Sequence, residues 1–272
     1  MSRTLPELTD ATLTLENRVA TLTLNRHDVR NALTGTALVD DIIATAAWVN
    51  RCQDVSVLVI TGTGSAFCAG GNVKDMAERS GDFAGDVAEV AERYRQGIQR
   101  MPLALNQVEV PIIAAVNGAA IGAGFDLANM ADLRIASRKA SFGETFLNLG
   151  IIPGDGGTWI LPRIIGEARA AELFYTGDVI DAATALEWGL VSRIVDAEAL
   201  LPEAEALAAK IATMPPHALR HAKNLMRQGR SMSYDGALEL AANTQALMHL
   251  TGDHMEGVDA LIEKRAPVFK GE

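Results

Sequence analysis

Apolar and polar residues alternate near the start of the chain. Ala11–Leu15 and Val19–Leu24 each show a period of two, and the polar residues 16–18 lie between them. A period of two is typical of a strand that buries one face. Two such runs joined by a short polar turn predict a β-hairpin over residues 11–24.

A helical period follows the hairpin. Apolar residues recur at Leu38, Ile42, Ala46 and Val49, three or four positions apart, which is the spacing of one face of an α-helix. Thr34 precedes them, and a threonine hydroxyl can accept a hydrogen bond from a free amide at a helix start. We therefore predict a helix with Thr34 as its N-cap.

Strands and helices then alternate along the chain. Val55–Ile60 has an apolar side chain at every other position, Val110–Val116 is apolar almost throughout, and Leu133–Ala136 resembles a shorter strand. Gly118–Met130 is predicted as a helix entered through glycines. Because alternating strands and helices imply parallel pairing with helical crossovers, the pattern predicts an α/β core.

Helical patterns dominate after Gly156, and only Ser192–Val195 still resembles a strand. We therefore divide the chain into an α/β part, residues 1–195, and a helical part, residues 196–272, that packs on the core or on a neighbouring subunit. The segments with an apolar stripe at helical spacing are 198–213, 217–229 and 234–250.

Composition narrows the function classes. The chain has 272 residues, of which 49% are hydrophobic, with 24 Lys and Arg against 34 Asp and Glu. The net charge of −10 and the lack of a basic cluster argue against a nucleic-acid partner, because phosphate backbones are bound by clustered cations. Cys52 and Cys68 do not form a CxxC or Cys/His cluster, which argues against a disulfide framework and a zinc site.

The chain also lacks the features of a secreted or membrane protein. Acidic residues lie within the first ten positions, where a signal peptide would be basic and then apolar. The longest uncharged run, residues 110–125, is shorter than the roughly 20 apolar residues that span a bilayer. We expect a cytoplasmic protein with no membrane partner.

Two glycine-rich stretches follow predicted strands and open predicted helices. They are Ser65–Val73 and Asn117–Asp126. Glycines let a ligand approach the backbone closely, and free amides at a helix start favour negative charge. Either stretch alone could be an ordinary turn, but two such turns side by side could form an oxyanion hole. The second stretch lacks the last glycine of a GxGxxG phosphate loop, because Leu127 stands there.

Short motifs in consistent order, from about residue 11 to residue 270, resemble those of the enoyl-CoA hydratase/isomerase (crotonase) superfamily. They are Phe67–Gly71, Pro111–Gly118, Asp132–Ala136, Ser141–Gly143, Leu149–Thr158, Tyr175–Asp178, Trp188–Val191 and Glu256–Arg265. The resemblance implies a spiral of ββα units with a helical C-terminal trimerisation region, a homotrimer or homohexamer, and an acyl-CoA thioester as substrate. It implies no separate cofactor and no metal.

The resemblance also assigns roles to particular residues. The amides of Gly71 and Ala123 would hold the thioester oxygen, and Ala69, Asn72 and Val73 would line the path of coenzyme A. Asn72 replaces an acidic residue that is usual in the family. Because the backbone makes the contact there, this change has little effect on the expected binding.

Two positions depart from the hydratase pattern, in which a pair of glutamates moves the protons. Asp126 stands at the first position and keeps a carboxylate, whereas Phe146 stands at the second, and a phenyl ring cannot activate water. Asp155 is a candidate replacement, because related dienoyl-CoA and ring-epoxide isomerases carry an Asp in this loop. In the epoxide isomerases the Asp follows the Pro directly, whereas Gly154 intervenes here.

Each candidate also has a purely structural interpretation. Asp126 could pair with an arginine at a helix end, and Asp155 could cap a helix over residues 156–165. Glu144 could reach the acyl pocket if its strand were regular. The residues expected to shape that pocket lie in 76–100 and 145–160, and they include apolar side chains such as Met76, Phe83, Tyr94 and Trp159.

The sequence thus predicts an acyl-CoA enzyme that stabilises a thioester enolate between Gly71 and Ala123. Proton transfer is assigned to Asp126, Asp155 or both. Phe146 favours isomerisation over simple hydration. The alternatives are a hydratase that uses Asp126 and Asp155, a lyase or hydrolase acting by decarboxylation or thioester hydrolysis, and a CoA-binding member without activity.

Overall fold

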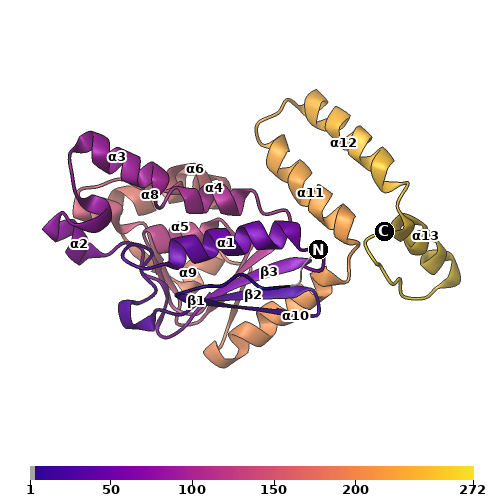
Figure 1. Ribbon diagram of the computed structural model, residues 1–272, viewed down its shortest axis with the longest axis horizontal. Helices are drawn as coiled ribbons and strands as arrows, with labels where there is room; N and C mark the ends of the chain where they lie inside the picture. The colour runs from indigo at the N-terminus through magenta and orange to yellow at the C-terminus, as the bar shows by residue number, and fades with distance from the viewer. Residues whose placement is uncertain (1–3) are drawn as a thin grey trace.

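A six-stranded sheet forms the centre of the fold in the computed structural model, which describes residues 4–272 (Figure 1). Its strand order is β1-β2-β3-β5-β7-β10. β1 and β2 form the predicted antiparallel hairpin, and the other pairs are parallel. The strands are β1 (Ala11–Glu16), β2 (Val19–Leu24), β3 (Val57–Gly62), β5 (Ile112–Val116), β7 (Leu133–Ser137) and β10 (Arg193–Val195).

A second, four-stranded sheet has the order β4-β6-β8-β9. Its strands are β4 (Ala66–Cys68), β6 (Ala119–Ile121), β8 (Ser141–Gly143) and β9 (Val179–Asp181). β4, β6 and β8 are parallel, and β9 is antiparallel to β8. Three times the chain leaves a strand of the large sheet, adds a strand to the small sheet and enters a helical turn, which is the expected ββα repeat.

The prediction of one helix over Gly118–Met130 is wrong in its first part. Residues Ala119–Ile121 form β6, and the helix α5 covers only Ala123–Asn129. All the strands of the small sheet have three residues, and so short a segment cannot show the alternation that identifies a strand. Pairing between neighbouring strands creates this sheet.

Helix α1 (Leu38–Arg51) buries the predicted apolar face, with Leu38, Ile42 and Val49 fully enclosed. Its N-cap is Ala37, so the assignment of that cap to Thr34 is wrong. The Thr34 hydroxyl instead accepts a hydrogen bond of 2.7 Å from the amide of Asn72. A side chain expected to start a helix therefore holds the first glycine turn.

Shorter helices surround the two sheets. They are α2 (Val73–Glu78), α3 (Val87–Gln96), α4 (Arg100–Asn106), α6 (Gly157–Ile160), α7 (Pro162–Ile165), α8 (Glu167–Thr176) and α9 (Ala182–Glu187). Short 3-10 turns add η1 (His27–Val29), η2 (Gly81–Phe83), η3 (Thr145–Leu149) and η4 (Ala197–Ala199). None of the helices in residues 4–272 combines the length and the apolar character needed to span a bilayer.

The C-terminal helices fall into two groups. Helix α10 (Leu200–Ala212) packs Leu200, Ala204 and Ala208 against the large sheet. Helices α11 (Pro216–Gly229), α12 (Tyr234–Met248) and α13 (Gly252–Glu263) extend away from the sheets (Figure 1). Several of their large apolar side chains are exposed: Met226, Leu238, Leu247, Leu250, Leu261 and Ile262.

Gly124 is a point of close backbone packing in helix α5. A Cβ at this residue would lie 2.0 Å from the carbonyl oxygen of Cys68 in β4. We expect Gly124→Ala to lower the free energy of unfolding by about 3 kcal/mol, because the strand and the helix must separate. Urea denaturation followed by circular dichroism measures the change.

Gly229 in helix α11 provides a matched control. A Cβ there would meet no atom within 4 Å, and alanine is the better helix former, so we expect Gly229→Ala to be neutral or to raise stability by up to about 1 kcal/mol. Equal effects of the two substitutions would show that the contact between β4 and α5 does not limit stability.

Candidate active site

The two glycine-rich turns meet at one edge of the small sheet. β4 and β6 are parallel neighbours, so the turns that follow these two strands leave the sheet at the same edge. Gly70 has a φ of 79°, and a Cβ on it would lie 2.6 Å from the carbonyl oxygen of Ile121 and 3.1 Å from the amide nitrogen of Ala123. Only glycine permits this approach. The sequence-predicted pair, Gly71 and Ala123, lines a single cavity.

The loop between β2 and α1 holds the first glycine turn. The Asn31 side chain donates to the carbonyl oxygen of Ala66 at 3.0 Å, and the Arg30 carbonyl accepts from the amide of Ala69 at 3.0 Å. The Leu33 amide donates to the Gly70 carbonyl at 2.8 Å. These bonds fix residues 66–70 from one side, so the amide of Gly71 is held by a rigid support.

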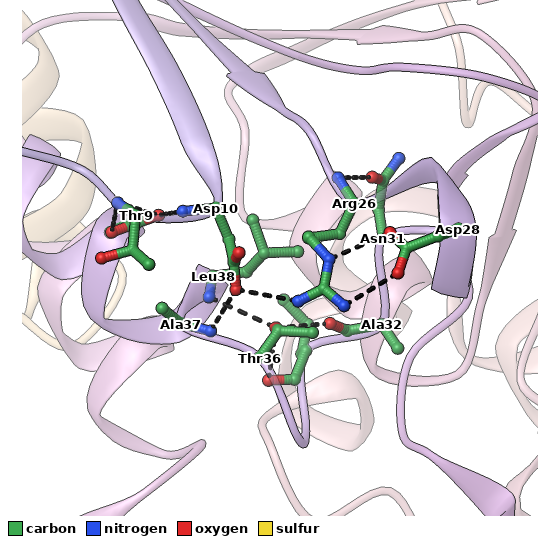
Figure 2. A network of polar contacts seen from close by, with 11 residues as sticks. Thr9, Asp10, Arg26, Asp28, Asn31, Ala32, Thr36, Ala37 and Leu38 are labelled. Carbon is green, nitrogen blue, oxygen red and sulfur yellow. Dashed lines mark hydrogen bonds and ion pairs between the residues drawn. The ribbon is translucent and has the colours of Figure 1, made fainter.

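An ion-pair network fixes this supporting loop in turn (Figure 2). The Arg26 guanidinium donates to Asp28 at 2.9 Å and to Asp10 at 3.2 Å. The Arg26 amide donates to the Asn31 side chain at 2.8 Å, and the Ala37 amide donates to Asp10 at 2.7 Å. The network therefore connects the start of β1, the loop and the start of α1.

The residues predicted to line the path of coenzyme A lie beside Gly71. Ala69 and Asn72 are half-buried and Val73 is exposed, but none of the three lines the cavity. The Asn72 side chain accepts a hydrogen bond of 3.0 Å from the Lys74 amide and so caps α2. Contact of these residues with coenzyme A stays a prediction.

Apolar and aromatic side chains make up most of the cavity wall. Met76, Phe83 and Tyr94, three of the four pocket residues named from the sequence, line the cavity. The fourth, Trp159, lies outside it and is 47% exposed, and the Arg163 guanidinium lies 4.0 Å from the centre of its ring. Thr34, Asp82, Arg93 and Asp155 supply the polar part of the wall. The apolar part comprises Met76, Phe83, Tyr94, Ile98, Phe146 and Ile151.

Three buried carboxyl groups come together at this cavity. Asp126 lies in the first turn of α5, Glu144 directly follows β8, and Asp155 precedes α6. Asp126 and Glu144 are fully buried, and Asp155 is 3% exposed. Of the three, only Asp155 lines the cavity. Asp126 packs against the start of α6, where a Cβ on Gly157 would lie 2.2 Å from an Asp126 oxygen.

These carboxyl groups have none of the usual partners of buried acids. Within residues 4–272, their oxygens accept no hydrogen bond from any other group. The proposed arginine partner of Asp126 is therefore not found. Nor does Asp155 cap a helix, because the N-cap of α6 is Gly156 and no side chain caps it. No His, Cys, Asp or Glu cluster in the described chain has the arrangement of a metal site.

Burial raises the pKa of all three groups because it disfavours the charged form. For Asp126, burial together with the nearby charges of Glu144 and Asp155 raises the pKa well above its usual value. Burial raises the pKa of Glu144 to about 8 and also raises that of Asp155. Interaction with the Asp126 side chain opposes the rise at both neighbours, and both neighbours raise the pKa of Asp126 in turn, so Asp126 is the group that interacts with each of the other two.

Phe146 is the residue that the sequence resemblance matches to the second glutamate of the hydratases, and this match stays a prediction. Its ring is half-buried, lines the cavity and would lie 3.5 Å from a Cβ on Gly122. A carboxylate in this place would face the cavity beside the amide of Ala123. In this protein the surface there is apolar.

The participation of Glu144 stayed open at the level of the sequence, because it depended on the regularity of the preceding strand. The residue follows a three-residue strand, and the amide of Gly122 donates to the carbonyl of Gly143 at 2.8 Å, which brings the end of β8 against the start of α5. The sequence offered one signal, an acidic residue directly after Phe142 and Gly143. Both of these residues are buried in the structure.

The fold brings Gly71, Ala123 and the buried carboxyl of Asp155 into the wall of one largely apolar cavity. The family model described as enoyl-CoA hydratase/isomerase matches residues 14–272. The chain therefore belongs to the enoyl-CoA hydratase/isomerase family, whose members act on CoA thioesters.

Several relatives match over nearly their whole length. A 1,2-epoxyphenylacetyl-CoA isomerase of Escherichia coli (strain K12) is 37% identical over 95% of this chain and 97% of its own. A crotonyl-CoA hydratase of Syntrophomonas wolfei is 38% identical over 93% and 95%. The crystal structure of an enoyl-CoA hydratase from Bacillus anthracis superposes with a TM-score of 0.90 at 35% identity, over 97% of this chain and all of the other. The predicted fold class is confirmed.

Proposed function

We propose that this enzyme shifts a double bond of an enoyl-CoA thioester by proton transfer, in preference to simple hydration. One observation carries the proposal: an unpartnered buried carboxyl, Asp155, lines the same cavity as Gly71 and Ala123, while Phe146 occupies the second glutamate's place. One relative is named as an isomerase, although of an epoxyphenylacetyl-CoA, and the relatives named as hydratases make hydration the alternative to test.

The reaction begins when the amides of Gly71 and Ala123 donate to the thioester oxygen. The Asp155 carboxylate then takes a proton from C2 of a 3-enoyl thioester, and the electrons of that C–H bond pass into a dienolate. The two amides stabilise its oxyanion without having to reorganise. Asp155 returns the proton to C4, the double bond moves from C3–C4 to C2–C3, and no atom is gained or lost.

Asp126 supports this step from behind the cavity. Its protonated carboxyl donates to Asp155, which stabilises the Asp155 carboxylate and sets its orientation. Because Asp126 does not line the cavity, direct contact between Asp126 and the substrate is not part of the proposal. The pair therefore divides the work that the sequence assigned to Asp126, Asp155 or both.

The remaining assignments follow from the walls of the site and the C-terminal helices. The apolar wall accommodates an acyl group with little charge, and coenzyme A runs past Ala69, Asn72 and Val73 as part of the substrate, without a separate cofactor. The exposed apolar side chains of α11 to α13 suit burial between subunits, in a cytoplasmic homotrimer or homohexamer. The division into residues 1–195 and 196–272 is likewise proposed.

Direct comparison of two substrates tests the proposed function. With purified protein, we expect kcat/KM for isomerisation of a 3-enoyl-CoA to exceed that for hydration of crotonyl-CoA by about 100-fold, because a second carboxylate that positions water is worth a factor of this size. Absorbance of the conjugated thioester follows both reactions.

The other outcomes identify the alternatives. Faster hydration of crotonyl-CoA would assign the protein to the hydratases. Release of free CoA thiol or carbon dioxide would indicate a hydrolase or a decarboxylase. Binding of acyl-CoA without any turnover would indicate a member without activity.

A further inference from the structure

Glu144 is the carboxyl group that the reaction above does not use. It is fully buried, its oxygens have no hydrogen-bond partner in the described part of the chain, its side chain interacts with that of Asp126, and it does not line the cavity. A buried acid without a partner lowers stability. A buried, unpartnered acid next to the proposed proton-transfer group Asp155 therefore points to a role of Glu144 in the proton transfer.

The order of the three groups limits where their protons can lie. The side chain of Asp126 interacts with those of both Glu144 and Asp155, whereas Asp155 acts on Glu144 only through its charge. Like charges this close cannot all ionise in a dry interior. A state in which the three carboxyls share two protons and one negative charge satisfies both interactions, because each protonated carboxyl donates a hydrogen bond to the next one.

The negative charge is best placed on Asp155, the carboxyl that lines the cavity. Asp155 is the group nearest to water and substrate, and Glu144 and Asp126 are the more deeply buried. A proton on Glu144 then faces Asp126, and the proton of Asp126 faces Asp155.

We infer that Glu144 is a positioning residue: its protonated carboxyl donates to Asp126 and thereby directs the proton of Asp126 toward Asp155, where the single negative charge is needed. The inference rests on the proposed function, because it takes Asp155 as the group that accepts the substrate proton. Glu144 itself does not touch substrate.

The arrangement makes activity depend on alkaline pH in a defined way. Burial raises the pKa of Glu144 to about 8, so the proton on Glu144 is lost as the pH passes that value. The Asp126 proton is then shared between two anions, and Asp155 loses part of its hydrogen bond. Activity is therefore expected to fall as Glu144 ionises.

Within residues 4–272, two other ionisable groups act on the pKa of Glu144, and both are carboxyls of the same cluster. The charged groups that affect Glu144 are Asp126 from α5 and Asp155 from the loop before α6. Cys68 of β4 and Tyr94 of α3 face Asp155, and burial raises the pKa of Cys68 to about 12 and that of Tyr94 above its usual value of 10.0. The expected alkaline limb therefore belongs to the three carboxyls.

The test compares Glu144→Gln with Glu144→Leu across the pH–rate profile of a 3-enoyl-CoA. Gln keeps a donor that cannot ionise, so Glu144→Gln is expected to retain kcat within about threefold at pH 7 and to move the alkaline midpoint up by at least about one pH unit. Leu removes the donor, so Glu144→Leu is expected to lower kcat by about 10- to 100-fold at pH values below the wild-type alkaline midpoint.

Two results overturn the inference. One is a Glu144→Gln profile with the wild-type alkaline midpoint. The other is a folded Glu144→Leu variant with wild-type kcat. If Glu144→Leu fails to fold, the Glu144→Gln profile alone decides, because a merely structural hydrogen bond would not move the midpoint.

A measurement without substrate separates this inference from the proposed function. In the wild type, stability from protonated Glu144 is fully present below about pH 4.5 and is lost as the pH rises through about 8. Urea denaturation should show a smaller decline over this window in Glu144→Gln, and infrared difference spectra at pH 7 should lack one protonated-carboxyl band. Unchanged decline and spectra refute the proton on Glu144 even if the enzyme proves to be a hydratase.

Discussion

Asp155→Asn is expected to lower kcat for isomerisation by about 10³-fold, which is the typical contribution of a positioned general base. The Asn side chain has nearly the same size but cannot accept a proton from carbon. The amides of Gly71 and Ala123 remain, so the dissociation constant of a non-reacting acyl-CoA should change little. Steady-state kinetics and calorimetric titration measure the two quantities.

Asp126→Asn is the matched control, because it changes the neighbouring carboxyl in the same way. Its amide can still donate to Asp155, so we expect a loss of only about tenfold, the smaller effect of a supporting hydrogen bond. A large loss in Asp126→Asn together with an active Asp155→Asn would reverse the roles and make Asp126 the base. Equal, small losses in both variants would remove the carboxyls from the mechanism.

Phe146→Glu is expected to raise hydration of crotonyl-CoA by about 100-fold, because it returns a carboxylate to the cavity wall where water can be activated. The ring of Phe146 lines the cavity and is only half-buried, so a glutamate there can reach water. Hydration is followed by the loss of absorbance of the conjugated thioester, and thermal unfolding confirms that the variant is folded.

Phe146→Gln separates the charge from the change of shape. Gln matches Glu in size but cannot take a proton from water, so hydration should stay at the wild-type rate. If both variants gain hydration equally, the wider cavity is responsible. If neither gains, Phe146 does not determine the proposed preference for isomerisation over hydration.

The sequence predicted the strands of the large sheet and missed those of the small one, and the difference lies in their length. Val19–Leu24 and Val57–Gly62 are long enough for one buried face to leave a periodic pattern. Ala119–Ile121 is too short for that, and it becomes a strand because β4 and β8 pair with it on either side. Thr34 shows the same limit, since its partner, the amide of Asn72, is 38 residues away.

By itself, the sequence determined the family, the α/β core and the glycine turns at Gly71 and Ala123. These are local properties of residue type, spacing and order. Only the tertiary structure decided that Asp155 faces the cavity while Asp126 and Glu144 lie behind it. The physical reason is that the position and burial of a carboxyl depend on segments that meet only in the folded chain. Its pKa depends on the same contacts, because burial without a partner disfavours the charged form.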